Sequence, residues 1–516
     1  MHFAGFRIQK TIVNLVEVLF CMSIGRDFLI LIPDLPPLPE PEKEMRMSPT
    51  LTPVPPASQP TTGQQAVLGG HTAADHEAGK KKSFWQLLNI SIGFLGIQFA
   101  WAIQMGQMSP LLEKLGSNPQ LLGLISCAGP VTGVLIQPIV GALSDGCKLS
   151  LGRRRPFLLL GALLTAVALV FMPNSGSLLM AAVLLWLLDA SINITQGPYR
   201  AMVPDVVHKS QQPTAYSLMS LTIGLGSMVA FLIAYQIHSL HTLFYLGATA
   251  IVVFMLWTMI TTPEPQPTQL SASEEANTSL GSFFRDTAKS IASMPAEGLK
   301  LCLAHSFTWF GLACLFTFFS VYVPHHVFGA ADPNSPLYLQ GVQWVSLCYF
   351  AMNAVCFAFS PLIGKLCGLT SKKATHSLGL LCLAVAFLSM PFIQTPIQVM
   401  LAMGLVGIGW ATTLSIPFAL LSDHLPPGRA GVMMGTFNIF IAAPGVLSNL
   451  LVGPVVSYFG NNHSVAMVIG GIAALISILL LQTVKESKAQ PHADARSQSV
   501  LPEIQTKCAT AVELGT

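Results

Sequence analysis

A succession of apolar segments, each about twenty residues long, runs from residue 84 to residue 484 and constrains the fold more than any other feature. Each segment is near the length that an α-helix needs to cross the ~30 Å hydrocarbon core of a bilayer. The chain has 516 residues, of which 52% are hydrophobic and only 9% charged. Since soluble proteins carry roughly 25% charged residues, we expect an all-α integral membrane protein. The twelve expected transmembrane helices are 84–107, 120–143, 156–172, 177–201, 214–237, 242–261, 299–323, 339–366, 374–393, 396–421, 430–457 and 463–484.

The twelve segments fall into two groups of six, separated by the polar stretch TPEPQPTQLSASEEANTS. A faint internal repeat supports this division, because the fourth helix ends PYRAMVPD at Asp205 and the tenth ends PFALLSD at Asp423. Two related six-helix halves predict a transporter whose site lies between them. The expected parts are an N-terminal tail (1–82), a first half (83–261), a linker (262–298), a second half (299–484) and a C-terminal tail (485–516).

The N-terminal tail is a poor candidate for a membrane span. Its apolar segment is interrupted by Glu17, Arg26 and Asp27, and residues 33–60 are rich in proline, which is typical of a disordered segment. A signal peptide is the alternative, although Glu17 interrupts its apolar region and no A-x-A cleavage site follows. We expect a chain that starts near residue 75 to insert and to function normally.

Lysine and arginine are concentrated on one set of loops, whereas the opposite set holds little beyond Lys114. By the positive-inside rule, both termini and the linker are predicted to be cytoplasmic, in the cell (inner or plasma) membrane. The basic residues of the first set are Lys80–Lys82, Lys148, Arg153–Arg155, Lys209, Lys372, Lys373, Arg429, Lys485 and Lys488.

The fourth expected helix carries a polar stripe through an otherwise apolar run. Asp189, Asn193, Gln196 and Arg200 fall at offsets of 0, 4, 7 and 11, so about 100° per residue places them within roughly 60° of one another. An acid near the bilayer centre costs on the order of 3 kcal/mol, so this face should meet other helices or water. Two interpretations remain: a hydrogen-bond cluster between helices, or a substrate and ion site at the membrane midplane.

Other helices offer side chains suited to a sugar, which needs planar hydrogen-bonding groups beside flat aromatic or apolar faces. Each Gln or Asn could instead form a hydrogen bond with a neighbouring helix. The histidine could instead be an interior residue whose hydrogen bonds are all made within the protein. The candidates are Gln98, Trp101 and Gln104 in the first helix, His305, Thr308 and Trp309 in the seventh, Trp410 and Thr413 in the tenth, Asn353 in the eighth and Asn438 in the eleventh.

A charged loop follows the second helix, in the sequence GALSDGCKLSLGRRRP. Asp145 ends the helix, and Arg153, Arg154 and Arg155 open the next one. The arginines have the alternative of being simple topology anchors. The arrangement of glycine, acid, tight loop and basic cluster resembles the loop signature of the major facilitator superfamily. That resemblance implies a cytoplasmic gating latch, to which we add Asp205.

Longer motifs narrow the resemblance. GIQFAWAIQMGQMSPLLEKLG, GPVTGVLIQPIVGALSD, LGRRRPF and LLDASINITQGPYRAMVPD resemble the sucrose/proton symporter family of plant sucrose carriers and animal sugar transporters, a glycoside-pentoside-hexuronide:cation symporter-like family. The second half, with HHVFGA and WATTLSIPFALLSDHLPPGRAGVMMGTFNIF, is more similar to the family's bacterial branch. The likeness covers about residues 84–484. It implies that Asp189 is the proton-coupling and sugar-binding carboxylate and that Arg200 is its basic companion.

The chain departs from the plant pattern at the outer end of the seventh helix. Plant carriers have acidic residues there, whereas this chain has His325 and His326. The departure puts plant-type sucrose specificity in question. The two histidines are either solvated loop residues or a pH-sensitive outer gate.

Together these features predict a secondary active transporter that takes up a sugar with a proton by alternating access. The expected sugar is a disaccharide such as sucrose or maltose, or a related glycoside. Protonation of Asp189 would remove the desolvation cost of its charge, so proton and sugar can favour each other's binding. No GxxxxGK[ST] loop, nucleophile–base set or metal-ligand spacing stands out, so we expect no ATP dependence, enzyme activity, cofactor, metal or nucleic-acid partner. The alternatives are a sodium-coupled carrier or exporter on the same fold, or a non-transporting sugar sensor.

Overall fold

The structure is a computed structural model, and it describes residues 81–147, 149, 151–264, 285, 289, 291–424 and 436–486. All of these belong to one unit, Gly70–Thr516. Twelve helical segments within the described residues are long and apolar enough to cross a membrane, which confirms the predicted all-α membrane fold. The predicted N-terminal tail lies outside the described residues except at its last two positions, as do most of the linker and of the C-terminal tail.

The first half contains six spans, two of which are interrupted. α2 and α3 form the first span, and α4 and α5 form the second, with a local break at Ile92 and at Cys127. Serine or asparagine side chains accept a backbone N–H at the start of several helices, which satisfies donors that a helix end leaves free. The helices are α2 (Phe84–Ser91), α3 (Gly93–Lys114), α4 (Pro119–Ser126), α5 (Ala128–Asp145), α6 (Arg155–Phe171), α7 (Leu178–Val206), α8 (Gln212–Gln236) and α9 (Leu240–Thr261).

The second half repeats this layout. Its first helix continues into a π-helical turn at Val323–Val327, where the sequence suggested a loop. The start of the predicted helix 430–457 lies partly outside the described residues. The helices are α11 (Ala296–Tyr322), α12 (Pro336–Leu369), α13 (Lys372–Ser389), α14 (Pro396–Ser422), α16 (Ile439–Tyr458) and α17 (Ser464–Gln482).

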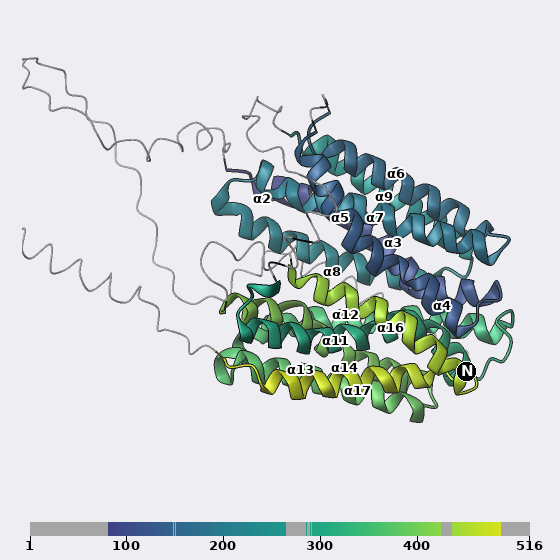
Figure 1. Cartoon of the computed structure of the whole chain (residues 1–516). Helices are drawn as coiled ribbons and strands as arrows, with labels where there is room; N and C mark the ends of the chain where they lie inside the picture. Colours follow the sequence, from purple (N-terminus) through teal and green to yellow (C-terminus); the bar gives the residue numbers. More distant parts are fainter. Residues whose placement is uncertain are drawn as a thin grey trace, which may run out of the picture. The chain divides into compact units, whose positions relative to one another are not determined.

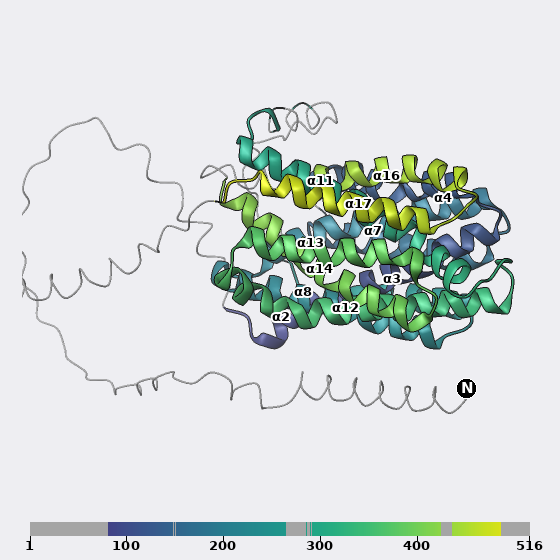
Figure 2. The same cartoon turned by 90° about the horizontal axis from the view of Figure 1, so that it is seen from below.

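The two halves use the same packing scheme. α6 packs against α7 and α9, and the corresponding α13 packs against α14 and α17. The halves meet where α8 lies against α12 and where α16 lies against α4 and α5. Figure 1 shows the first-half helices, in purple to teal, as one group and the second-half helices, in green to yellow, as another, and Figure 2 shows α4 beside α16 from a second direction.

The two ends of the bundle differ in their charged residues. The basic end carries Lys82, Arg153–Arg155 and Lys372, and the opposite end carries Glu113 and His325. The first helix ends at Lys114 rather than at the predicted 107. It extends because Met108, Leu111 and Leu112 are buried and continue its packed face.

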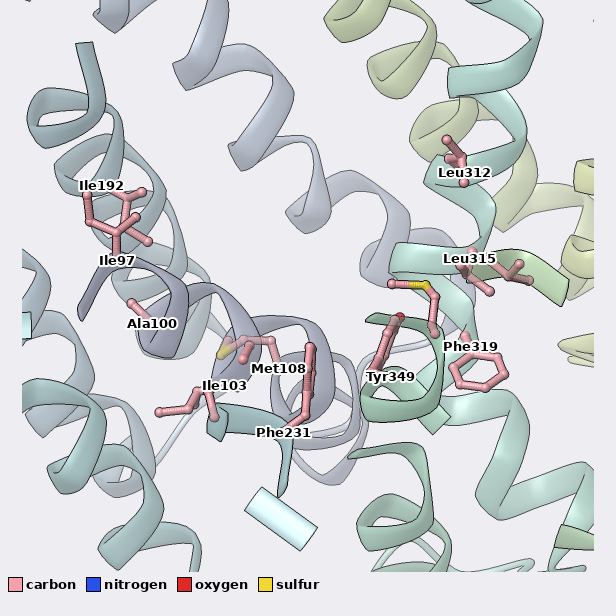
Figure 3. Packing of buried hydrophobic residues seen from close by; sticks show 14 of the residues in the cluster. Ile97, Ala100, Ile103, Met108, Ile192, Phe231, Leu312, Leu315, Phe319 and Tyr349 are labelled. Atoms are coloured by element: carbon pink, nitrogen blue, oxygen red, sulfur yellow. The ribbon is translucent and has the colours of Figure 1, made fainter. Parts of the chain in front are cut away.

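The contact between the halves is closest at the opposite end. A Cβ added to Gly123 in α4 would lie 2.1 Å from the carbonyl oxygen of Asn449 in α16, and one added to Gly453 would lie 2.4 Å from that of Pro119. No side chain fits at such distances, so glycine allows these two backbones to touch. Phe231 of α8 and Tyr349 of α12 stack with ring centroids 5.0 Å apart, and both lie among the packed side chains of Figure 3.

Candidate functional site

A cavity of about 1600 Å³ lies between the two halves. Its wall runs from Ser109 and Asn449, near the opposite end, to Ala142 and Gly364, which lie within the last turns of α5 and α12 at the basic end. Helices of both halves contribute to it. The cavity therefore occupies the place where a two-half transporter holds its substrate, with access from the basic end.

Asp189 of α7 lies in the wall of this cavity and is 1% exposed. Its carboxylate accepts a hydrogen bond of 2.8 Å from the Nε2 atom of Gln104 in α3. The amide oxygen of Gln104, Oε1, is buried without a hydrogen-bond partner within the described residues. A buried carboxylate with one amide donor, next to an unsatisfied amide oxygen, has capacity left for a proton and for hydroxyl groups of a ligand.

The polar stripe continues from Asp189 through a network with α5. Asn193 donates 3.1 Å to the hydroxyl of Thr132 and accepts 2.6 Å from the amide of Gln137. Asn193, Gln137 and Gln196 all line the cavity. The stripe pairs α7 with α5 by hydrogen bonds and also lines a cavity.

Arg200 lies at the end of the stripe that is nearer to the basic end, and it also lines the cavity. Arg200 is exposed because its side chain faces the open volume of the cavity. The described residues provide it with no ion-pair partner. A guanidinium in this position can donate hydrogen bonds to a ligand or to a carboxylate that approaches in another conformation.

The second-half wall of the cavity carries a cluster of aromatic side chains. The Trp309 and Trp410 rings meet edge to face, with centroids 5.8 Å apart, and Phe316 meets Trp410 in the same way at 5.7 Å. From the first half, Trp101 and Gln98 also line the cavity. Ser227 of α8 donates 2.9 Å to the Gln98 amide oxygen, which fixes that side chain.

The structure separates the remaining sequence candidates into two sets. Asn353 and Asn438 line the cavity, whereas His305, Thr308 and Thr413 are buried outside its lining. His305 accepts a hydrogen bond from Trp309 Nε1 at 2.8 Å and stacks on Phe437, and Thr308 pairs with Ser477. These helices are apolar on all sides, so their sequence does not indicate which face meets the cavity.

The predicted gating residues form an ion-pair network within the first half. Arg154 contacts Asp145 at 2.5 Å and Asp205 at 2.9 Å, and Arg153 contacts Asp205 at 2.5 Å. Partial burial lowers the pKa of Arg153, but the carboxylates of Asp205 and Asp145 raise it above its ordinary value. Arg155 instead donates to the carbonyl oxygen of Met259 at the end of α9. In this conformation, then, the described contacts of the set do not bridge the halves.

Glu264, which sequence reasoning treated only as part of a polar linker, organises this loop. Its carboxylate accepts the backbone N–H groups of Arg153, Arg154 and Arg155 at 2.6 to 3.2 Å. Gly152 makes room for it, since its φ is +110° and an added Cβ would lie 2.5 Å from the carboxylate. An acid at the start of a helix is favourable for the free N–H groups and the helix dipole.

The second half has a corresponding arrangement. Glu486 accepts the backbone N–H groups of Lys372 and Lys373 at the start of α13, and Lys372 pairs with Asp423 at 2.7 Å. Asp423 is the residue that the internal repeat aligned with Asp205. The repeat therefore extends to the contacts that hold the basic end of each half together.

Hydrogen bonds join the two halves at the part of the cavity nearest the opposite end, and the sequence did not reveal them. Ser109 of α3 donates 2.8 Å to the carbonyl of Thr317 in α11. Thr317 donates 2.8 Å to the amide of Asn449, which donates 2.9 Å to the carbonyl of Ser126. This chain of contacts crosses twice between the halves, and its four residues all line the cavity.

Comparison with known proteins identifies the family. The sequence profile of the Major Facilitator Superfamily matches residues 90–449 and 342–510. Sucrose transport protein SUC4 of Arabidopsis thaliana is 25% identical over 467 residues, covering 78% of this chain and 91% of its own length. The general alpha-glucoside permease of Schizosaccharomyces pombe is 26% identical, and the match covers 78% of this chain and 93% of the permease.

These relatives correct one expectation. They come from a plant and a yeast, so the predicted placement in a bacterial branch finds no support. The bacterial placement was inferred from short motifs in the second half of the sequence.

Solved structures agree with the fold. The crystal structure of the nucleoside transporter NupG has a TM-score of 0.61 at 13% identity, covering 79% of this chain and 100% of that one. The crystal structure of a peptide transporter POT in complex with sulfate has a TM-score of 0.61 at 14% identity, and the match covers 80% of this chain and 97% of that one. The similar proteins are transporters rather than enzymes, and this chain is a multi-pass membrane protein of the Major Facilitator Superfamily.

Proposed function

We propose that this protein takes up a sugar together with a proton by alternating access. The proposed substrate is a disaccharide such as sucrose or maltose, or a related glycoside. The observation that carries the proposal is a buried carboxylate, Asp189, that lines a cavity of about 1600 Å³ whose second-half wall carries the aromatic cluster of Trp309, Phe316 and Trp410. The plant and yeast relatives, a sucrose transport protein and an alpha-glucoside permease, support the substrate class.

The two walls suit the two kinds of surface on a sugar. Hydroxyl groups need planar donors and acceptors, which Gln104, Gln137 and Gln196 offer on the first-half wall. The C–H faces of a pyranose ring pack well on flat aromatic surfaces, which Trp309 and Trp410 offer on the second. A sugar that bridges the walls would contact both halves at once.

Proton coupling is assigned to Asp189. Charged, this buried carboxylate lacks most of its hydration; neutral, it can donate as well as accept a hydrogen bond. If the sugar prefers the neutral form, binding of the proton and binding of the sugar favour each other by the same factor. Binding of both, rather than of either alone, would then allow the halves to rock.

The remaining roles concern access. We assign the basic end to the cytoplasm of the cell membrane, with both termini on that side, because the positive charges lie there. The present conformation then faces inward. Asp145, Arg153, Arg154, Arg155 and Asp205 would act as the inner gate by rearranging when the basic ends of the halves meet, and Arg200 would act near that gate through its charge or by direct contact with the sugar.

Uptake by purified protein in liposomes tests the proposal. A panel of labelled glycosides would be offered with an inward proton gradient, with a sodium gradient, and with neither. We expect concentrative uptake of one or more disaccharides or glycosides with the proton gradient alone. Concentration driven by sodium would overturn the coupling, and absence of counterflow for every sugar would favour a sensor.

A further inference from the structure

Four side chains meet at the opposite end of the bundle, away from the cavity. Glu113 comes from α3 in the first half, whereas His325, Tyr338 and His463 come from the second. His325 Nε2 lies 2.8 Å from Glu113 Oε1, and His463 Nε2 lies 3.8 Å from the same oxygen. The Tyr338 hydroxyl donates to Glu113 Oε2. This set, the Glu113 cluster, bridges the two halves.

The contact between His325 and Ala330 determines which ring nitrogen of His325 carries the proton. Its Nδ1 lies 2.6 Å from the carbonyl oxygen of Ala330. A carbonyl oxygen only accepts, so Nδ1 carries the proton. In the neutral ring Nε2 then has a lone pair that faces the carboxylate of Glu113. Two acceptors at 2.8 Å repel, so a cation must lie between them, either a second proton on the ring or a metal ion.

His463 favours the metal ion over a proton on His325 alone. Its side chain is only 6% exposed, and its Nε2, which faces Glu113, is too far from that carboxylate for a good hydrogen bond. The rings of His325 and His463 lie nearly parallel, with centroids 5.5 Å apart. One ligand atom from each of the three residues lies within 4.8 Å of the others.

We propose that Glu113, His325 and His463 bind a divalent transition metal ion of the Zn²⁺ class. Two imidazole nitrogens and one carboxylate oxygen are a common protein ligand set for Zn²⁺, with water as the fourth ligand. Ligands at ~2.0 Å in a tetrahedron lie ~3.3 Å apart, so the observed 2.8 and 3.8 Å need only small side-chain movements. Hard ions such as Mg²⁺ prefer oxygen ligands and would not compete.

The surroundings of two of the three proposed ligands match those of a metal site, whereas Nδ1 of His463 has no hydrogen-bond partner among the described residues. A metal-bound histidine usually donates its other ring N–H to a backbone carbonyl, and His325 does so to Ala330. A metal-bound carboxylate is usually itself hydrogen-bonded, and Tyr338 donates to the free oxygen of Glu113. Lys114, the nearest positive charge on α3, is exposed, and its Nζ lies 5.9 Å from the Tyr338 ring centroid.

A bound ion would also affect which conformation the transporter adopts. Because Glu113 belongs to the first half and both histidines to the second, opening of this end would break the metal site. Metal binding should therefore stabilise the conformation described here, with its cavity reached from the basic end. This consequence rests on the proposed alternating access, whereas the metal site itself does not.

Zn²⁺ titration of the metal-stripped, full-length protein in detergent tests the site. Calorimetry should show one Zn²⁺ site that is lost or weakened at least roughly 100-fold in His463→Gln and in Glu113→Gln, since loss of a ligand should cost no less than loss of an outer partner. Mg²⁺ should produce no such signal. His326→Gln is the matched control, because that neighbouring histidine is exposed and its described contacts, to the carbonyl of Pro391 and the ring of Tyr322, lie outside the cluster.

A milder variant keeps the test interpretable if a ligand variant does not fold. Tyr338→Phe removes one hydroxyl and should weaken Zn²⁺ binding about 10- to 100-fold. Zn²⁺ should also raise the melting temperature of the wild type but not of the ligand variants. The cysteines are the same in every protein compared, so any binding to them cancels.

Two outcomes would contradict the proposed site. The first is equal Zn²⁺ binding by the wild type and by His463→Gln. The second is a Zn²⁺ signal that is absent or that Mg²⁺ also produces. Either result would mean that a proton alone occupies the cluster. Transport is measured separately. Zn²⁺ binding without uptake of any sugar would sustain the site and contradict the proposed function, whereas uptake without Zn²⁺ binding would do the reverse.

Discussion

The two halves share a packing scheme but present different surfaces to the cavity. The first half contributes Asp189 and amides held by hydrogen bonds to one another, whereas the second contributes the edge-to-face pair Trp309 and Trp410. At the basic end the halves are alike, because Glu264 and Glu486 each accept backbone N–H groups at the start of a helix that lies earlier in the chain. The repeat has thus preserved the scaffold, while the chemistry of the site has been divided between the halves.

This division predicts that coupling and sugar affinity can be separated by mutation. Changes to the polar wall should alter coupling, and changes to the aromatic wall should alter affinity. Changes to the matching scaffold contacts should alter stability in both halves alike.

Asp189→Asn should have the largest effect. Asn keeps the size of the side chain and can still accept from Gln104, but it cannot take up a proton. We expect accumulation of sugar against its gradient to be lost, while counterflow of labelled sugar persists. Asp332→Asn, an exposed acid in a loop at the opposite end, is the control and should behave as wild type. Full accumulation by Asp189→Asn would place the coupling elsewhere.

Trp410→Ala should mainly reduce sugar affinity. The change removes the flat surface that Trp309 and Phe316 hold in place. We expect the apparent KM to rise about tenfold, equivalent to ~1.4 kcal/mol, with the accumulation ratio at saturating sugar unchanged. Trp257→Ala tests an exposed tryptophan outside the cavity lining and should leave KM unaltered. A loss of coupling with normal KM would break the proposed division of roles.

Arg200→Lys should impair transport by several-fold rather than abolish it. Lysine keeps the positive charge but not the planar fork of donors. Initial rates of uptake at fixed protein level in the membrane would measure the effect. Rates equal to those of the wild type would reduce Arg200 to an anchor at the helix end.

Glu264→Gln and Glu486→Gln should each lower stability by about 1 kcal/mol, because each carboxylate satisfies free N–H groups at a helix start. Thermal unfolding in detergent would measure both. A large loss for one and none for the other would contradict the equivalence of the two scaffolds.

Asp145→Asn should have the smallest effect. The Asp145 side chain is 64% exposed, and an exposed ion pair contributes under ~1 kcal/mol. Cysteine labelling from each side would show whether the inner gate shifts. A change larger than that of Asp205→Asn, whose carboxylate contacts both Arg153 and Arg154, would show that Asp145 acts in another conformation.

The fold was predictable because the bilayer imposes a length on each helix. The fourth helix was predicted at 177–201 and is observed at Leu178–Val206. Asp189 was also predictable, since an acid in an apolar run is costly unless it has a function or a partner. Gln137 and Thr132 were not singled out, because a single polar side chain in a transmembrane helix does not indicate which face it occupies.

Contacts between residues that are far apart in the chain could not be predicted from the sequence. Glu113 and His325 are 212 positions apart, and nothing in either local sequence pairs them. Glu264 was assigned to a polar linker by its neighbours, although its role is to cap α6 across 109 or more residues. Such contacts depend on how the halves and helices pack, which local composition does not encode.

Sugar-evoked proton movement is the most direct test of the central claim that Asp189 couples the two fluxes. Purified wild-type protein in lightly buffered liposomes, without an imposed gradient, would be given sugar on the outside while the external pH is recorded. We predict a rise in external pH with wild type as protons enter with the sugar, and none with Asp189→Asn, although that variant still exchanges labelled sugar. An equal pH rise with Asp189→Asn, or sugar entry into wild-type liposomes without any pH change, would contradict the account.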